Sequence, residues 1–280
     1  MNAIYSLLLI SLLASPSNAE GVIELPEMKV ENENPRLLFQ DVKGPTPNLS
    51  DKKRYPFELG EKYEYKVYHR TFMSNVLIGK CLMETGDLKK IDGRWAVSFK
   101  LAAISADWYK WVLVIKDSAE GYFDLESNET LFLEVNKREN KYRSSNQVYF
   151  DTKKNTITEK DITEDSPKFK KYQIPDDILD AYSIVYLIRK QDLNTVKEIR
   201  YNIYSHGKVY PYYSKVLGKY KINLNGKLYD TFKVQVLTKI VGALEQKGGI
   251  FVFFSADERK IPMKIKADVK VGHFVADLIE

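Results

Sequence analysis

Alternation of apolar and polar side chains, repeated over much of the chain, constrains the fold more than any other feature of the sequence. The first clear run follows Phe57, and one of its faces would carry Tyr63, Tyr65, Val67 and His69. The last run lies at 261–271 and alternates apolar residues with Lys264, Lys266 and Lys270. A period of two residues is typical of a β-strand with one buried and one solvent-facing side. The sequence therefore predicts a mainly β fold.

Two turn signals indicate that neighbouring strands are antiparallel. Asp92-Gly93 separates strands predicted at 77–85 and 94–103, and Asn225-Gly226 separates strands predicted at 212–224 and 232–236. These dipeptides suit two-residue hairpin turns, in which both residues take a positive φ. Segment 108–116 is denser in apolar residues, so we predict a strand that is covered on both faces.

One segment departs from the β pattern. After Pro175-Asp176-Asp177, apolar residues recur at spacings of three and four. This spacing predicts an amphipathic helix near 176–190, with carboxylates at its start and Arg189 at its end to suit the helix macrodipole. We therefore expect a curved antiparallel sheet, half-barrel or sandwich-like, with this one helix packed against it.

The N-terminal residues have the pattern of a secretory signal peptide. An apolar run at 4–14 is followed by Ser15 to Ala19, with small residues before a cut at Glu20. We predict a signal peptide at 1–19, a flexible Pro-rich tether at 20–55 and a single mainly β domain at 56–280. No later segment has the length of a transmembrane helix, so we expect no transmembrane anchor in the mature chain and a soluble, periplasmic protein, with secretion beyond the periplasm as an alternative.

Few residues of the catalytic and metal-binding types are present. Cys81 is the single cysteine, so we expect a buried, inert thiol and no disulfide. His69, His206 and His273 have no metal-ligand spacing, and the common nucleophile and phosphate-loop motifs are missing. We assign no catalytic residue, metal or cofactor. The 43 basic and 38 acidic residues are interspersed, and we expect no nucleic-acid partner.

Several clusters have both a structural and a functional interpretation. Asp176, Asp177 and Asp180 suit either capping of the predicted helix or acid–base chemistry, and capping is favoured. Segment 257–260 has the mixed charges of a solvated turn. The aromatic residues Trp108, Tyr109 and Trp111 are ligand-binding candidates, with core packing as the simpler explanation. Lys264, Lys266 and Lys270 are anion-binding candidates, with protection of a sheet edge as the alternative.

Three segments together resemble the domain of unknown function 3108 family. They are Pro56-Phe57-x-x-Gly60-Glu61-x-x-x-Tyr65, the segment 175–189, and the ending at 251–279 with Ser255-Ala256-Asp257-Glu258-Arg259-Lys260-Ile261-Pro262. The resemblance spans about 57–280, and Phe253 and Phe254 stand where the family often has tryptophan. It implies an exported bacterial envelope protein with an antiparallel β fold, one helix and no established activity. It also implies that Asp180, Ser183 and Arg189 organise the helix against the sheet.

Our leading hypothesis is a noncatalytic periplasmic module that binds an apolar or amphiphilic envelope component or a protein partner. The partner would be an envelope lipid, a glycan or a protein. One alternative is an envelope hydrolase that acts on glycan or ester substrates through carboxylates, assisted by His69 or His206. A second alternative is a polyanion binder that uses the lysine-rich strand face.

Overall fold

The alternating segments form the strands of one large curved sheet. The computed structural model describes residues 23–29, 35–40, 46–164, 166–237, 249–269 and 271–279. Its first strands are β1 (Ile23–Glu24), β2 (Glu27–Met28), β3 (Phe39–Gln40), β4 (Lys62–Arg70), β5 (Asn75–Ile91), β6 (Arg94–Ser105), β7 (Lys116–Asp124), β8 (Thr130–Glu139) and β9 (Tyr142–Asp151). The others are β10 (Thr156–Asp161), β11 (Lys168–Gln173), β12 (Ile178–Asp180), β13 (Glu198–Ser205), β14 (Lys208–Leu224), β15 (Lys227–Val236), β16 (Ile250–Ser255), β17 (Pro262–Asp268) and β18 (His273–Ile279).

Hydrogen bonding connects these strands in one continuous order. From one end to the other the order is β2–β11–β10–β9–β8–β7–β6–β5–β4–β18–β17–β16–β15–β14–β13–β12. The short strands β1 and β3 add to β14 and β5. The pair β12–β13 is parallel and the other pairs are antiparallel, so the sheet is mixed.

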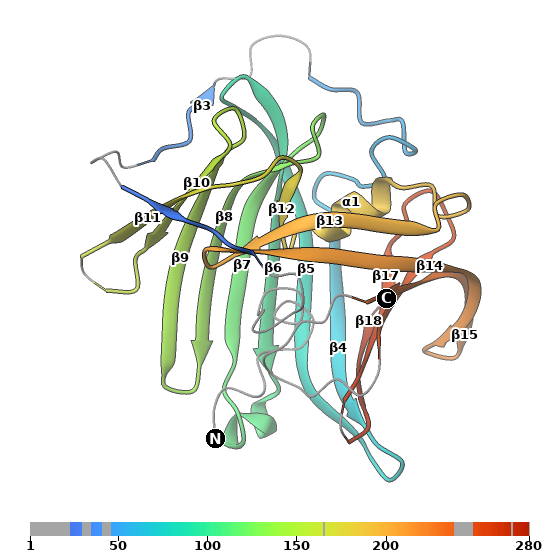
Figure 1. The fold of residues 1–280 in the computed structure, drawn as a ribbon. Coiled ribbons are helices and arrows are strands. Elements are labelled where there is room, and N and C mark those ends of the chain that lie inside the picture. The colour runs from blue at the N-terminus through green and yellow to red at the C-terminus, as the bar shows by residue number, and fades with distance from the viewer. Residues whose placement is uncertain are drawn as a thin grey trace.

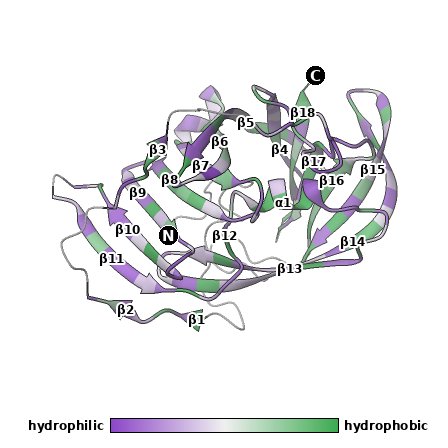
Figure 2. Cartoon of the chain, turned by 90° about the horizontal axis from the view of Figure 1, so that it is seen from above, coloured by the Kyte–Doolittle hydropathy of each residue, from purple (hydrophilic) through white to green (hydrophobic). Residues whose placement is uncertain are grey.

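The sheet curves around a helix and stays open. In Figure 1, β13 and β14 run across the strands β4 to β9 rather than alongside them. Seen from above, the helix α1 (Ile184–Lys190) lies between these two parts of the curve (Figure 2). The main core fills this space, where Tyr186, Leu187 and Ile188 of α1 are buried among side chains from the concave face. Burial of these apolar side chains is the main favourable contribution to folding.

The predicted fold class and both hairpin turns are confirmed. Asp92 and Gly93 take φ values of 50° and 83° between β5 and β6, and Asn225 and Gly226 take 52° and 85° between β14 and β15. These positive φ angles are those of the turn that fits the right-handed twist of paired strands.

The helix is present, but it is shorter than predicted. It begins at Ile184 rather than near 176, and residues 178–180 form β12, where Ile178 pairs with Asn202 of β13. Asp177 has a φ of 55°, which is left-handed backbone and prevents a right-handed helix from passing through this position. Ile178 and Leu179 are both buried, as they would also be on a helix that faces the core. The spacing of apolar residues therefore could not distinguish a strand from a helix at this position.

The prediction of a strand at 108–116 is wrong. Residues Asp107–Trp111 form a short 3₁₀ helix, η1, in the connection from β6 to β7, and regular pairing resumes at Lys116. Trp111 is 94% exposed, so the high apolar content of this segment does not reflect burial.

The N-terminal segment pairs with two distant parts of the curved sheet. Glu24 of β1 pairs with Lys208 of β14, and Glu27 of β2 pairs with Tyr172 of β11. The predicted signal peptide at 1–19 lies outside the described residues, and the boundaries at 55 and 56 stay a prediction. In the ranges that the structure describes, no helix combines the length and the apolar character that a bilayer-spanning segment needs.

Candidate functional site

An apolar cavity lies between α1 and the concave face of the sheet. Its volume is about 80 Å³, and its lining is almost entirely apolar. The helix contributes Ile184, Val185 and Ile188, and the sheet contributes residues that include Cys81, Met83 and Phe254. A cavity of this size exceeds the space of one water molecule but is far smaller than a drug-sized site of about 300–1,000 Å³. It therefore suits a small apolar group or the end of an acyl chain.

Tyr212, which lines the cavity, and Ser214 beside it on β14 carry buried hydroxyl groups. Tyr212 of β14 lines the cavity and is 2% exposed, and Ser214, two residues along the same strand, is fully buried. Neither hydroxyl oxygen makes a well-formed hydrogen bond to another described residue. Burial raises the pKa of Tyr212 to about 12, although the nearby Ser214 hydroxyl opposes this shift. Tyr212 is therefore a neutral donor that a polar group at the end of an apolar ligand can use.

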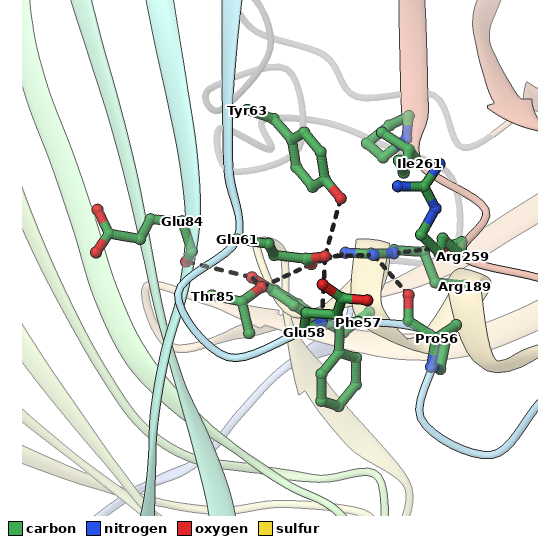
Figure 3. Close-up of polar contacts among 12 residues, drawn as sticks. Pro56, Phe57, Glu58, Glu61, Tyr63, Glu84, Thr85, Arg189, Arg259 and Ile261 are labelled. Carbon is green, nitrogen blue, oxygen red and sulfur yellow. Dashed lines mark hydrogen bonds and ion pairs between the residues drawn. The ribbon is translucent and has the colours of Figure 1, made fainter. Parts of the chain in front are cut away.

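A buried ion pair ties α1 to the segment that precedes β4. The Arg189 side chain is fully buried, and its Nη1 lies 2.6 Å from Oε1 of Glu61, whose side chain is 7% exposed. Arg189 also donates from Nη2 to the carbonyl of Pro56 at 2.6 Å and from Nε to the carbonyl of Arg259 at 2.9 Å. One guanidinium thus joins the helix to two other parts of the fold (Figure 3).

The Glu61 carboxylate is fully engaged by its neighbours. It accepts hydrogen bonds from the Tyr63 hydroxyl at 2.8 Å and from the Thr85 hydroxyl at 3.0 Å, and the Glu58 amide lies at 3.2 Å (Figure 3). Thr85 and the Tyr186 hydroxyl are 3.0 Å apart. Because the charges are paired and hydrogen-bonded, the cluster is suited to fixing the helix in place rather than to reacting with a substrate.

The Asp180 carboxylate lies at the turn that leads into α1. It is fully buried and accepts hydrogen bonds from the Thr130 hydroxyl at 2.5 Å and from the amides of Tyr182 and Ser183 at 2.6 and 3.0 Å. Burial raises the pKa of Asp180, and these hydrogen bonds oppose that shift. Asp180, Ser183 and Arg189 therefore occupy the positions expected of residues that organise the helix, and that role stays a prediction.

Two neighbouring carboxyl groups lie on the concave face, and the sequence patterns did not lead us to predict this pair. Asp117 of β7 and Glu139 of β8 are 8% and 9% exposed. Burial raises the pKa of Asp117 to about 6. The Arg138 amide, which donates to Asp117 at 2.9 Å, opposes this shift, whereas the nearby Glu139 carboxyl group increases it. The alternation of residues in β7 could have indicated it, because Asp117 lies on the same face of the strand as the apolar residues Ala119 and Phe123.

The other acidic and thiol candidates are separated from one another. Asp176 and Asp177 are exposed while Asp180 is buried, so the three carboxylates do not form one site. Cys81 is buried, and burial raises the pKa of its thiol to about 12. The turn at 257–260 is held by Arg259, which bonds Asp257 at 2.8 Å. Within the described ranges, no cluster of His, Cys, Asp and Glu is arranged to hold a metal ion.

His69 and His273 lie on the paired strands β4 and β18, whereas His206 lies elsewhere in the fold. His69 Nε2 is 2.9 Å from the carbonyl of Val271, and its ring packs against Phe274. His206 lies at the turn between β13 and β14 with a φ of 48°, and burial lowers its pKa. His273 begins β18, and burial lowers its pKa too.

The predicted aromatic candidates lie away from the cavity. Trp108 and Trp111 belong to η1 and are 51% and 94% exposed, and Tyr109 packs partly against the core. The Trp108 indole donates to the carbonyl of Leu77 at 2.8 Å, which fixes η1 to β5. None of the three lines the cavity between α1 and the sheet.

Two of the predicted anion-binding lysines are already paired. Lys264 Nζ lies 3.1 Å from Asp277, and Lys266 Nζ lies 2.9 Å from Asp268. Lys270 lies outside the described residues. A charge that is compensated within the fold attracts an anionic polymer less strongly, so this arrangement lends no support to a polyanion site.

Comparisons with solved structures give low-identity matches. A β-barrel-like protein of domain of unknown function DUF1849 from Brucella abortus is 11% identical, with a TM-score of 0.49 and coverage of 79% of this chain and 96% of the other. A candidate lipoprotein from Parabacteroides distasonis is 10% identical, with a TM-score of 0.27 and coverage of 79% and 94%.

The comparison with protein families is more specific. No curated protein matches the chain in sequence. Residues 64–279 match the family described as "Protein of unknown function (DUF3108)". This range contains α1, Asp180, Arg189 and almost every strand of the curved sheet. Because the match extends over most of the sequence, the chain belongs to the DUF3108 family.

Proposed function

We propose that this protein is an exported, periplasmic, noncatalytic β module that binds an apolar or amphiphilic envelope component. The observation that carries the proposal is the apolar cavity between α1 and the sheet, which Tyr212 with its buried hydroxyl helps to line. An apolar pocket with a small number of polar groups is the usual form of a site for such a ligand. The ligand would place an apolar end in the cavity and a polar group near Tyr212.

Export and the domain boundaries are part of the same proposal. The signal-like pattern at 1–19 supports export, and the continuous sheet from β4 to β18 supports a single domain at 56–280. Asp180, Ser183 and Arg189 would keep α1 in position, so that one wall of the cavity is fixed relative to the other. A protein partner at this site is the alternative occupant.

The direct test is native mass spectrometry of the protein after gentle release from its own cell envelope. The expected result is a retained small molecule that dissociates as an apolar or amphiphilic compound. A complementary calorimetric titration of the delipidated protein uses a medium-chain fatty acid as the probe, because the cavity accommodates the end of an acyl chain. Val185→Phe places a larger side chain at the cavity wall and should weaken probe binding at least tenfold, because the space for the probe is filled.

The matched control is Val196→Phe. Val196 is also partly buried against the core, but it does not line the cavity, so this variant should bind the probe like the parent. A parent protein that retains no molecule and binds the probe no better than Val185→Phe would contradict the proposal.

An envelope hydrolase that acts through carboxylates is the second candidate function, and the Asp117 and Glu139 pair favours it. One of two adjacent carboxyl groups with a pKa near 6 has the protonation behaviour of a general acid. Hydrolysis of a glycan or ester substrate should then be abolished in Asp117→Asn, whereas Glu120→Gln on the outward face of the same strand should retain it.

A further inference from the structure

We propose that one end of the curved sheet is a docking surface for an anionic lipid membrane. The surface, named here the rim, is formed by three connections at 71–74, 106–115 and 140–141 and by the strand ends beside them. This proposal concerns a different part of the molecule from the cavity and does not depend on the cavity being occupied.

The topology brings the three connections to the same edge. Strands β4, β6 and β8 alternate with β5 and β7 in an antiparallel arrangement, so β4, β6 and β8 run in the same direction. Their C-terminal ends therefore lie at one edge of the sheet. The hairpin of β4 and β5, the coil of η1 and the hairpin of β8 and β9 all appear at the lower end of the molecule in Figure 1.

Apolar side chains at the rim are exposed without any packing role. Phe72 and Met73 are 105% and 90% exposed at the tip of the β4–β5 hairpin, and Trp111 is 94% exposed in η1. The hairpin tip is closed by a hydrogen bond from the Thr71 amide to the Ser74 carbonyl at 2.8 Å, which presents the two apolar residues outward. Concentrated exposure of large apolar groups in a folded protein marks an interaction surface.

The third connection adds positive charge. Arg138, Lys141 and Arg143 are exposed at the β8–β9 hairpin, and Tyr142 beside them is 57% exposed. Asp107 is the one acidic residue within 71–74, 106–115 and 140–141, and its carboxylate is paired with Lys110 at 2.6 Å. At the adjoining strand ends Asp117 and Glu139 are buried, so the charge that the rim exposes next to its protruding aromatic residues is mainly basic.

This combination fits a lipid surface. Tryptophan, phenylalanine and tyrosine insert at the level of lipid headgroups, where one part of the ring is apolar and the other is hydrated. Lysine and arginine beside them attract anionic headgroups, and each contributes about a fivefold increase in binding near such a surface. The apolar residues stand on separate hairpin tips, which is suited to shallow insertion at several points.

The test is sedimentation of the exported protein with vesicles, after the mature N-terminus has been determined by mass. Vesicles of phosphatidylglycerol and phosphatidylcholine should bind the parent, and pure phosphatidylcholine should bind it more weakly. The double variant Phe72→Ser/Trp111→Ser should reduce binding at least tenfold, because two exposed apolar anchors are lost. Lys141→Gln should reduce binding about fivefold, and added salt should weaken binding of the parent.

The matched control is Leu217→Ser/Leu228→Ser. Both leucines are exposed, at 49% and 66%, but they lie in β14 and β15 away from the rim, so vesicle binding should not change. Insertion should also shift the tryptophan emission of the parent to shorter wavelength, and this shift should be smaller in Trp111→Phe, in which Trp108 of η1 remains.

Two outcomes would overturn the proposal. One is equal vesicle binding by the parent and by Phe72→Ser/Trp111→Ser. The other is a parent that binds neither kind of vesicle, which would leave the rim as a surface for a protein. Because the cavity residues are unchanged in these variants, probe binding in the cavity reports separately on the proposed function.

Discussion

Arg189 and Glu61 hold each other by two contacts, Nη1 to Oε1 at 2.6 Å and Nη2 to Oε2 at 3.2 Å, although 128 residues separate them along the chain. The pair lies where α1, the segment before β4 and the turn at 257–260 meet. It connects the helix, and therefore one wall of the cavity, to these two segments.

Replacement of Arg189 should strongly destabilise the fold. Arg189→Met leaves the buried Glu61 carboxylate without its cation, so the free energy of unfolding should fall by about 3–5 kcal/mol. Glu61→Gln leaves the guanidinium uncompensated and should have a similar effect. The double variant should be less destabilised than the sum of the two, because no unpaired charge is then buried. Urea denaturation measures all three.

The control for the ion pair is Glu120→Gln. Glu120 and Lys100 form an exposed pair at 3.3 Å, with about half of each side chain accessible. Loss of an exposed pair should change the free energy of unfolding by no more than about 1 kcal/mol. Equal effects for Arg189→Met and Glu120→Gln would show that the buried pair does not stabilise the helix.

Asp117 should make stability depend on pH. Its pKa of about 6 in the folded protein is above the ordinary value of an aspartate, so the folded state binds the proton more tightly than the unfolded state. Stability from this group is therefore present below about pH 4 and is lost as the pH rises through about 6. The loss should be about 1–2 kcal/mol, because residual solvent access reduces the full effect.

Asp117→Asn isolates this contribution. Relative to the parent, the variant should gain about 1–2 kcal/mol in unfolding free energy between pH 4 and pH 7, since an amide has no proton to lose. Glu120→Gln, on the outward face of β7, serves as the control and should show no such gain. A difference that stays constant with pH would mean that Asp117 titrates as an ordinary carboxyl.

The Cys81 thiol should be unreactive in the folded protein. Burial raises its pKa to about 12, so little thiolate exists near pH 8, and the side chain is covered by the core. Labelling with iodoacetamide should be about a thousand times slower than in the urea-unfolded protein. Rapid labelling under native conditions would indicate that the cavity wall opens at Cys81.

Gly121 should tolerate no side chain. A Cβ atom at this position of β7 would lie 2.4 Å from the Phe132 carbonyl and 2.7 Å from the Phe99 ring. Gly121→Ala should therefore reduce the free energy of unfolding by about 1–3 kcal/mol through overpacking. Glu120→Ala, at the neighbouring exposed position, should have a much smaller effect, and thermal unfolding compares the two.

Local sequence patterns predicted the parts of the fold that local chemistry controls. The alternation through Tyr65 and Val67 places these side chains on the buried face of β4, and Asn225-Gly226 forms the turn between β14 and β15. In each case the nearby residues contain the physical cause, which is strand pleating or a positive φ.

Features that depend on distant partners could not be predicted in the same way. Ile178 belongs to a strand because it pairs with Asn202 of β13, and its own spacing from neighbouring apolar residues equally suited a helix. The apolar character of Trp111 indicated burial, but the 3₁₀ turn places it at the surface. The sequence predicts that Arg189 organises the helix, and this role stays a prediction, whereas its pairing with Glu61 depends on residues 128 positions apart.

The attachment of β1 to β14 and of β2 to β11 has a consequence for the order in which the chain assembles. Residues 23–28 are synthesised before every strand to which they bind, and their partner Lys208 is synthesised much later. Contacts between such distant residues form slowly, because the intervening chain must first lose its freedom. The first strands to leave the ribosome should therefore be among the last to find their partners.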